Sequence, residues 1–194
     1  MRNERPQTHN ARPESKAVET GDAMIGPEHA RTMARYNQWQ NESLYRAADA
    51  LTDVERAADR GAFFGSIQAT LNHLLWGDRI WMSRFAGLPK PSAPNIPASV
   101  GECGDWETLK RTRAEFDPRI VAWADSLTGQ GLAGNLSWFS GSVRRDVTRP
   151  LWMLVTHFFN HQTHHRGQVH AMLTAAGAKP GDTDLFLMPE EYWP

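Results

Sequence analysis

The sequence is poor in the features that mark secreted and membrane proteins. It contains one cysteine, Cys103, so no disulfide can form within the chain, as is usual in a reducing cytoplasm. No stretch approaches the roughly 18 consecutive apolar residues of a membrane-spanning helix. The polar segment that follows Met1 also lacks the apolar core of a secretory signal. We therefore expect a cytoplasmic protein that does not enter a membrane.

An excess of one charge and a phosphate-binding loop are equally absent. The 21 Lys and Arg residues nearly balance the 22 Asp and Glu residues, which gives a net charge of −1. Because the chain has no basic cluster, nucleic acid is not expected as a partner. The glycines lie singly rather than in a glycine-rich phosphate loop. No pair of carboxylates has a spacing that indicates glycosidase chemistry.

The chain divides into a short polar segment and one domain. Residues 1–24 are polar and show no hydrophobic period, so we expect a disordered N-terminal extension. Met1 and Met24 are both candidate translation starts. Residues 25–194 have the length expected of one domain with a single core.

Four long segments of this domain have the apolar spacing of amphipathic helices. In the first, one helical stripe contains Met33, Tyr36, Gln40, Leu44 and Ala47. Pro118 predicts a kink or a local break in the third. Start and stop signals place the predicted helices at about residues 27–50, 62–85, 105–127 and 150–176.

The segments between these helices differ in character. Residues 52–61 are a charged connection with room for one short helical turn, and residues 87–104 contain four prolines and form a long loop. Residues 135–140 and 143–147 flank Gly141-Ser142 and predict a small β-hairpin.

These elements predict an all-α fold. We expect an up-down-down-up four-helix bundle with a long connection between the second and third helices. The tail residues Leu185, Phe186 and Leu187 are expected to pack on it. Facing helices of such bundles often carry metal ligands on their inner sides.

Histidines are concentrated in the fourth predicted helix. Five of the eight lie between residues 157 and 170. His161 and His165 are four residues apart, so they share one helix face, as two ligands of a single metal ion require. His157 and His161 have the same spacing, and spacing alone does not choose between the two pairs. His164 falls on another face and is expected to be structural or exposed, and His170 is expected to lie at the surface or in packing.

A third ligand would come from another helix. His73 is the one histidine in the second predicted helix, next to the apolar face near Leu74. Three imidazoles would suit Zn²⁺, Ni²⁺ or another first-row ion. Three protein ligands leave coordination positions open, as in catalytic rather than structural zinc sites.

Three segments of the sequence stand out together: ARYNQWQN at 34–41, SIQATLNHLLWGD at 66–78 and NHQTHHRGQ at 160–168. In this order they resemble the DNA-damage-inducible DinB family, within the DinB/YfiT-like superfamily of metalloenzymes. The resemblance covers about residues 27–190. It implies a four-helix bundle, often dimeric, with a divalent metal held by three histidines. Carried over to this chain, the ligands are His73, His161 and His165.

The resemblance also sets the functional expectation. Relatives in the superfamily include thiol-dependent transferases and isomerases, so the chain is expected to be a zinc- or nickel-dependent enzyme, a thiol-dependent transferase or a hydrolase. A small-molecule substrate, a low-molecular-weight thiol and a second copy of the chain are the expected partners. The alternative is a non-catalytic metal-binding stress-response protein.

Residues beside the predicted ligands carry weaker expectations. Arg166 is expected to pair with a carboxylate such as Asp78 or to be solvated. Gly167 costs about 1 kcal/mol against alanine in a helix interior, and close approach of another helix would explain it. Asn72 directly precedes a ligand and therefore points about 100° away from it. Tyr36 is expected to pack in the core rather than to line the pocket over the metal.

Overall fold

The computed structural model describes residues 23–141 and 143–194, which are mostly helical. The expected extension at residues 1–24 lies almost entirely outside the described residues. The expected all-α class is confirmed, apart from one small antiparallel sheet. No helix in the described part of the chain is both long and apolar enough to span a membrane. The four long helices are α1 (Pro27–Asp49), α3 (Ile67–Phe85), α5 (Trp106–Ser126) and α7 (Leu151–Ala175).

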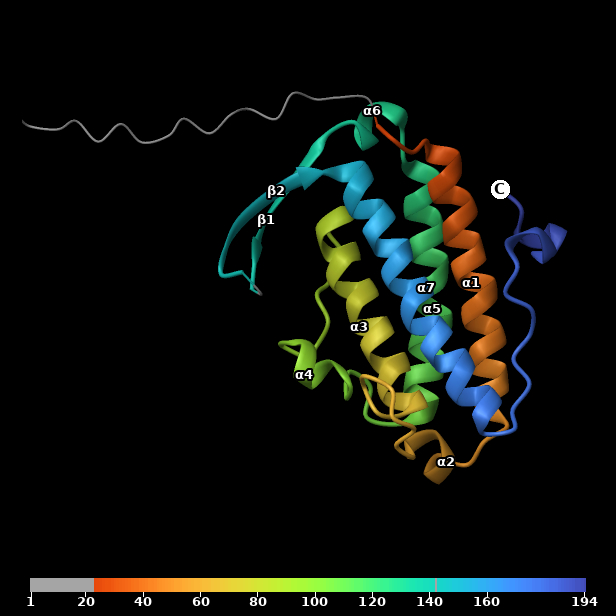
Figure 1. Ribbon diagram of the computed structural model, residues 1–194. Helices are drawn as coiled ribbons and strands as arrows, with labels where there is room; N and C mark the ends of the chain where they lie inside the picture. The colour runs from red at the N-terminus through yellow and green to blue at the C-terminus, as the bar shows by residue number, and fades with distance from the viewer. Residues whose placement is uncertain (1–22, 142) are drawn as a thin grey trace, which may run out of the picture.

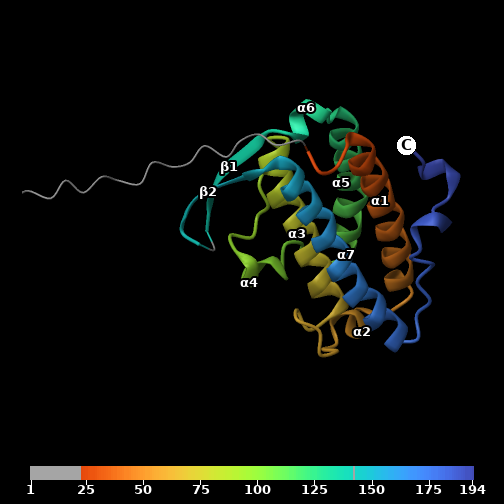
Figure 2. The ribbon, with the colours of Figure 1, turned by 45° about the horizontal axis from the view of Figure 1, so that its top comes forward.

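The long helices pack side by side along their lengths. Helix α1 packs against both α5 and α7, and α3 packs against α7 on the side away from α1 (Figures 1 and 2). Helices α3 and α7, which carry the candidate ligands, are therefore direct neighbours. The shorter helices are α2 (Asp53–Ala57), α4 (Ile96–Ser99), α6 (Gly129–Leu132), η1 (Leu185–Leu187) and η2 (Glu190–Tyr192).

Local signals explain where the helices begin and end. The second predicted helix starts at Ile67 rather than residue 62, because Gly65 has a φ of +77° and the Ser66 side chain caps the amide of Ala69. Asp105 caps α5 through the amide of Thr108. Helix α5 continues through Pro118 without the predicted break.

The connecting segments are more ordered than the sequence predicts. The connection at 52–61 contains α2, which Thr52 and Glu55 begin with a reciprocal capping box. The long loop at 87–104 contains α4, whose N-cap is Asn95. The predicted hairpin is present as β1 (Asn135–Ser140) and β2 (Arg145–Pro150), with Trp138 opposite Val147. It projects beyond α3 and α7 (Figure 1).

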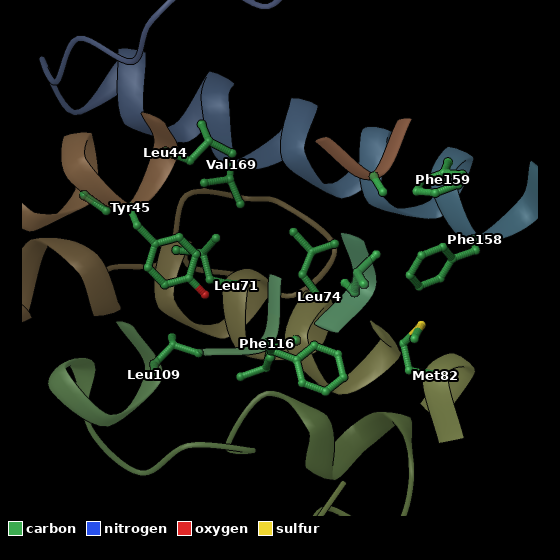
Figure 3. Packing of buried hydrophobic residues seen from close by; sticks show 14 of the residues in the cluster. Leu44, Tyr45, Leu71, Leu74, Met82, Leu109, Phe116, Phe158, Phe159 and Val169 are labelled. Carbon is green, nitrogen blue, oxygen red and sulfur yellow. The ribbon is translucent and has the colours of Figure 1, made fainter. Parts of the chain in front are cut away.

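The apolar core is formed by the facing sides of the four long helices (Figure 3). Fully buried side chains come from each of these helices, for example Leu44, Leu71, Leu109 and Phe158. Truncation of such a leucine to alanine costs about 2–5 kcal/mol, so this core supplies a large part of the stability. It also fixes α3 against α7, and with them the histidines.

A buried polar network lies within this core. Arg113 on α5 contacts Asp78 on α3 and Asp117 on its own helix, each at 2.6 Å. The Asn41 amide on α1 donates to Asp117 at 3.0 Å, and the Gln162 amide on α7 donates to Asp78 at 2.7 Å. The network therefore links all four long helices.

Arg166 does not pair with Asp78, because Arg113 and Gln162 occupy that carboxylate. Arg166 is buried and donates to the side-chain oxygens of Asn37 and Thr163. Both expectations for Arg166, an ion pair with Asp78 and a solvated side chain, were therefore wrong.

The C-terminal tail runs along α1 on the side away from the hairpin (Figure 1). The Tyr36 hydroxyl donates to the carbonyl of Thr183 at 2.6 Å, so Tyr36 holds the tail. Contrary to expectation, the tail side chains of Leu185, Phe186 and Leu187 are exposed, and Met188 is the tail residue that is buried.

Candidate metal centre

The structure brings together the three histidines that the sequence singles out. His73 comes from α3, and His161 and His165 come from successive turns of α7. One ring nitrogen of each lies within 4.8 Å of one ring nitrogen of the others. Among the described residues, no further His, Cys, Asp or Glu joins this group. The arrangement therefore offers three imidazole ligands and no fourth protein ligand.

The distance between the rings suits a shared cation. The Nε2 atoms of His73 and His161 are 3.3 Å apart. Two imidazole nitrogens on one tetrahedral ion, each about 2.0–2.1 Å from it, would be about 3.3 Å apart. Two lone pairs facing each other at this distance repel unless a proton or a cation lies between them. The donor set and its spacing thus fit a divalent metal.

Hydrogen bonds fix the orientation of two of the rings. The Ser99 hydroxyl donates to the carbonyl of Ile96 at 2.6 Å, so its oxygen accepts from Nδ1 of His73 at 2.8 Å. The Gln168 side-chain oxygen accepts from Nδ1 of His165 at 2.8 Å. Both bonds place the ring proton on Nδ1 and leave Nε2 free, as a metal-ligating histidine requires.

Burial also keeps these rings neutral. Desolvation, with the neighbouring His165, lowers the pKa of His73 to about 4. Desolvation and the surrounding histidines lower the pKa of His161 to about 3, and burial also lowers the pKa of His165. Only a neutral imidazole can bind a metal, so the rings are in the ligating form at neutral pH.

The structure also separates the two candidate pairs on α7. His157 lies one turn before His161, but its ring packs edge-on against Trp81, with the centroids 5.2 Å apart. It is not one of the three histidines whose ligand atoms converge. His164 is exposed, as expected, and His170 is partly exposed. The 161/165 pair is therefore the one that His73 completes.

Sequence reasoning missed two residues that shape the site. A Cβ atom on Gly77 would lie 3.0 Å from Cε1 of His161, so the glycine makes room for that ring. Phe64 stacks on His73, with ring centroids 3.9 Å apart. The sequence pattern placed Phe64 inside the predicted helix at 62–85, whereas Phe64 lies in the turn before α3. Its contact with His73 was therefore not predicted. Gly77 lies in the segment at 66–78 that resembles the family, but nothing in the sequence linked it to His161.

Gly167 and Asn72 lie next to the candidate ligands in the sequence, and the structure shows what surrounds each of them. In the described part of the chain, no atom of another helix lies within 4 Å of a Cβ placed on Gly167, so close helix approach does not explain that glycine. Asn72 faces away from the metal candidates, as its helical position predicts. Its side-chain oxygen accepts from the amide of Cys103 at 2.7 Å, which anchors the long loop to α3.

The histidines line a large pocket. Its volume is about 770 Å³, within the range of small-molecule sites. All three candidate ligands face it, together with the strand residue Ser140 and the α4 residue Ile96. Most of its wall is aromatic or aliphatic, with Phe63, Phe64, Trp76, Ile80, Trp81 and Trp138. The three-histidine site is therefore accessible to a ligand of considerable size.

Comparison with known proteins agrees with the sequence resemblance. The model of the DinB family matches residues 24–192. The protein named DinB from Bacillus subtilis (strain 168) is 25% identical over 158 residues, which cover 78% of this chain and 88% of the relative.

Proposed function

Since the chain belongs to the DinB family, we propose that it is a divalent-metal-dependent enzyme whose open site activates a low-molecular-weight thiol for transfer. One observation carries the proposal: three convergent histidines, without a fourth ligand among the described residues, line a pocket of about 770 Å³. Catalytic sites keep such open positions, whereas structural sites are closed by four protein ligands.

The proposed scaffold is an up-down-down-up four-helix bundle. The packing of α1 against α5 and α7, and of α3 against α7, supports it. Zinc and nickel are the proposed ions, because imidazole ligands suit both. His73, His161 and His165 would hold the ion, with Ser99 and Gln168 as the acceptors that orient two of the rings.

A divalent cation held there would supply Lewis acidity, which lowers the pKa of a thiol in the pocket. The thiol then releases its proton to solvent. Its sulfur lone pair forms a bond to an electrophilic carbon of the second substrate, and the bond from that carbon to its leaving group breaks with the electron pair going to the leaving group. The wall of the pocket is mostly aromatic and aliphatic, which limits the number of water molecules at the reacting carbon and favours transfer to the thiol over hydrolysis.

A non-catalytic metal-binding stress-response protein is the competing proposal. In that case the ion would only join α3 to α7. The size of the pocket argues against this alternative, since a structural ion needs no cavity beside it. Hydrolysis by an activated water is the second enzymatic option, and it uses the same ligands.

The direct test is spectroscopic and kinetic. The chain is loaded with Co²⁺, and its visible spectrum is recorded before and after addition of 2-mercaptoethanol. We expect a sulfur-to-cobalt charge-transfer band in the wild type and none in His165→Ala. Turnover of the thiol with an aryl halide should then require metal. If cobalt binds but neither the band nor turnover follows, thiol transfer is refuted, and the hydrolytic and non-catalytic alternatives remain.

A further inference from the structure

The pocket contains one permanent charge, Arg84, which lies near His157 and beyond the three candidate ligands along α3. Of its lining residues in the described part of the chain, Arg84 is the only lysine or arginine. The guanidinium carbon lies 4.6 Å from the ring centroid of Trp81 and 5.4 Å from that of Trp138. Cation–π contact with the two rings restrains the guanidinium, which retains N–H donors for a ligand.

Arg84 has no anionic partner within the described residues. No carboxylate there lies within ion-pair distance of it. By contrast, Arg79 on the same helix contacts Glu102 at 2.6 Å. Burial lowers the pKa of Arg84, which reflects a cation held partly out of water. A half-buried cation without a compensating anion, at a pocket wall, is a binding group for an anion.

The spacing along α3 connects Arg84 to the metal candidates. His73, Gly77, Ile80 and Arg84 follow a 4-3-4 spacing, so they lie on one helix face. The Cα atoms of His73 and Arg84 are about 16 Å apart along the axis of an ideal helix. The arginine side chain leans back toward the N-terminal end of the helix, which shortens the span. The surface between them is apolar, with Trp76 and Ile80.

We propose that Arg84 binds a carboxylate or similar anionic group at the far end of the ligand that occupies the pocket. The ligand is thus an elongated molecule with a donor atom at the histidines, an apolar middle and an anion at Arg84. This inference rests on the proposed function for the identity of the metal-binding end. The anion site itself depends only on Arg84 and the two tryptophans.

The test compares two probes that differ only at the far end. The full chain, metal-free and Zn²⁺-loaded, is titrated calorimetrically with 8-mercaptooctanoate and with 8-mercaptooctan-1-ol. In both forms we expect the carboxylate probe to bind about tenfold or more tightly than the alcohol, as a charge-assisted hydrogen bond in a partly buried site provides. In Arg84→Met this ratio should fall to about one, and the affinity for the alcohol should change little.

Matched variants separate the binding role from charge and folding. Arg84→Lys should keep part of the preference for the carboxylate probe, because lysine retains the positive charge but lacks the paired N–H donors of the guanidinium. Arg119→Met removes a charge from an exposed position on α5 and should keep the wild-type ratio. Circular dichroism of each variant confirms that it is folded.

Equal binding of the two probes by the wild type, or a preference that survives in Arg84→Met, would overturn the anion site. Failure of both probes to bind the metal-free chain and the Zn²⁺-loaded chain would also overturn the anion site. Because the ratio is also measured without metal, failure of the chain to load Zn²⁺ would refute the proposed function and still leave the Arg84 result decisive.

Discussion

A Cβ atom on Gly77 would lie 3.0 Å from Cε1 of His161. The glycine on α3 therefore determines how closely the α7 ring can approach His73. Alanine is favoured over glycine in a helix interior by up to about 1 kcal/mol, so this glycine lowers helix propensity while it makes room for the ring.

Gly77→Ala should thus separate stability from metal binding. We expect the free energy of unfolding of the metal-free protein to change by no more than about 1 kcal/mol. The affinity for Zn²⁺ should fall about tenfold or more, because His161 is displaced. Chelator competition and chemical denaturation measure the two quantities. Gly167→Ala on α7, where a Cβ would meet no atom of another described element within 4 Å, is the control that should leave affinity unchanged.

Ser99→Ala removes the acceptor for Nδ1 of His73. Loss of such an oriented acceptor typically reduces metal affinity by about 10–100-fold. We expect that reduction with little change in melting temperature of the metal-free protein. Ser83→Ala is matched to it, since the Ser83 hydroxyl also donates to the carbonyl three residues earlier but lies away from the histidines. Equal effects of the two variants would show that the Ser99 bond does not orient the ligand.

The pH dependence of the metal-free protein should carry the signature of buried histidines. In the unfolded chain the rings bind protons below about pH 6.5, whereas in the folded protein the pKa of His73 is lowered to about 4 and that of His161 to about 3. The unfolded state therefore binds more protons over this interval, and stability should decrease as the pH falls from about 6.5 to 4. Denaturation at a series of pH values tests this, and the decrease should be smaller in His161→Gln. An identical profile in that variant would assign the effect to other groups.

Arg113→Met should be strongly destabilising. It leaves the buried carboxylates of Asp78 and Asp117 without their shared cation, and removal of one partner from a buried ion pair costs about 3–5 kcal/mol. Urea denaturation measures the loss. Arg111→Met, an exposed arginine on the same helix, should change stability by less than about 1 kcal/mol. A small effect of Arg113→Met would mean that water or protonation compensates the carboxylates.

The sequence predicted the long helices because their apolar spacing, caps and breakers agree. Pro27 and Asp105 begin helices, and Gly177 with a φ of +81° follows the end of α7. The helix prediction from sequence failed at residues 62–66, where a β-bridge between Ala62 and Gly65 replaces the first predicted helical turn. The apolar character of Phe63 and Phe64 fits a helix and a pocket wall equally well.

The candidate ligands could be found from spacing and resemblance, but their surroundings could not. The acceptor for His73 comes from Ser99 on a separate short helix, and no local pattern links two residues that far apart in the chain. The buried network was missed for a related reason. Gln162 and Arg166 sit in polar positions of the α7 pattern, yet they are buried because Asp78 and Asn37 on other helices accept their hydrogen bonds.

The central claim is that His73, His161 and His165 hold one divalent ion. It is tested most directly by elemental analysis of the purified chain after equilibration with Zn²⁺ or Ni²⁺ and removal of loosely bound metal. We expect about one ion per chain in the wild type and in His164→Ala, whose side chain is exposed and outside the cluster. His161→Ala should retain almost none. A wild type without metal, or equal retention in His161→Ala, would contradict the account.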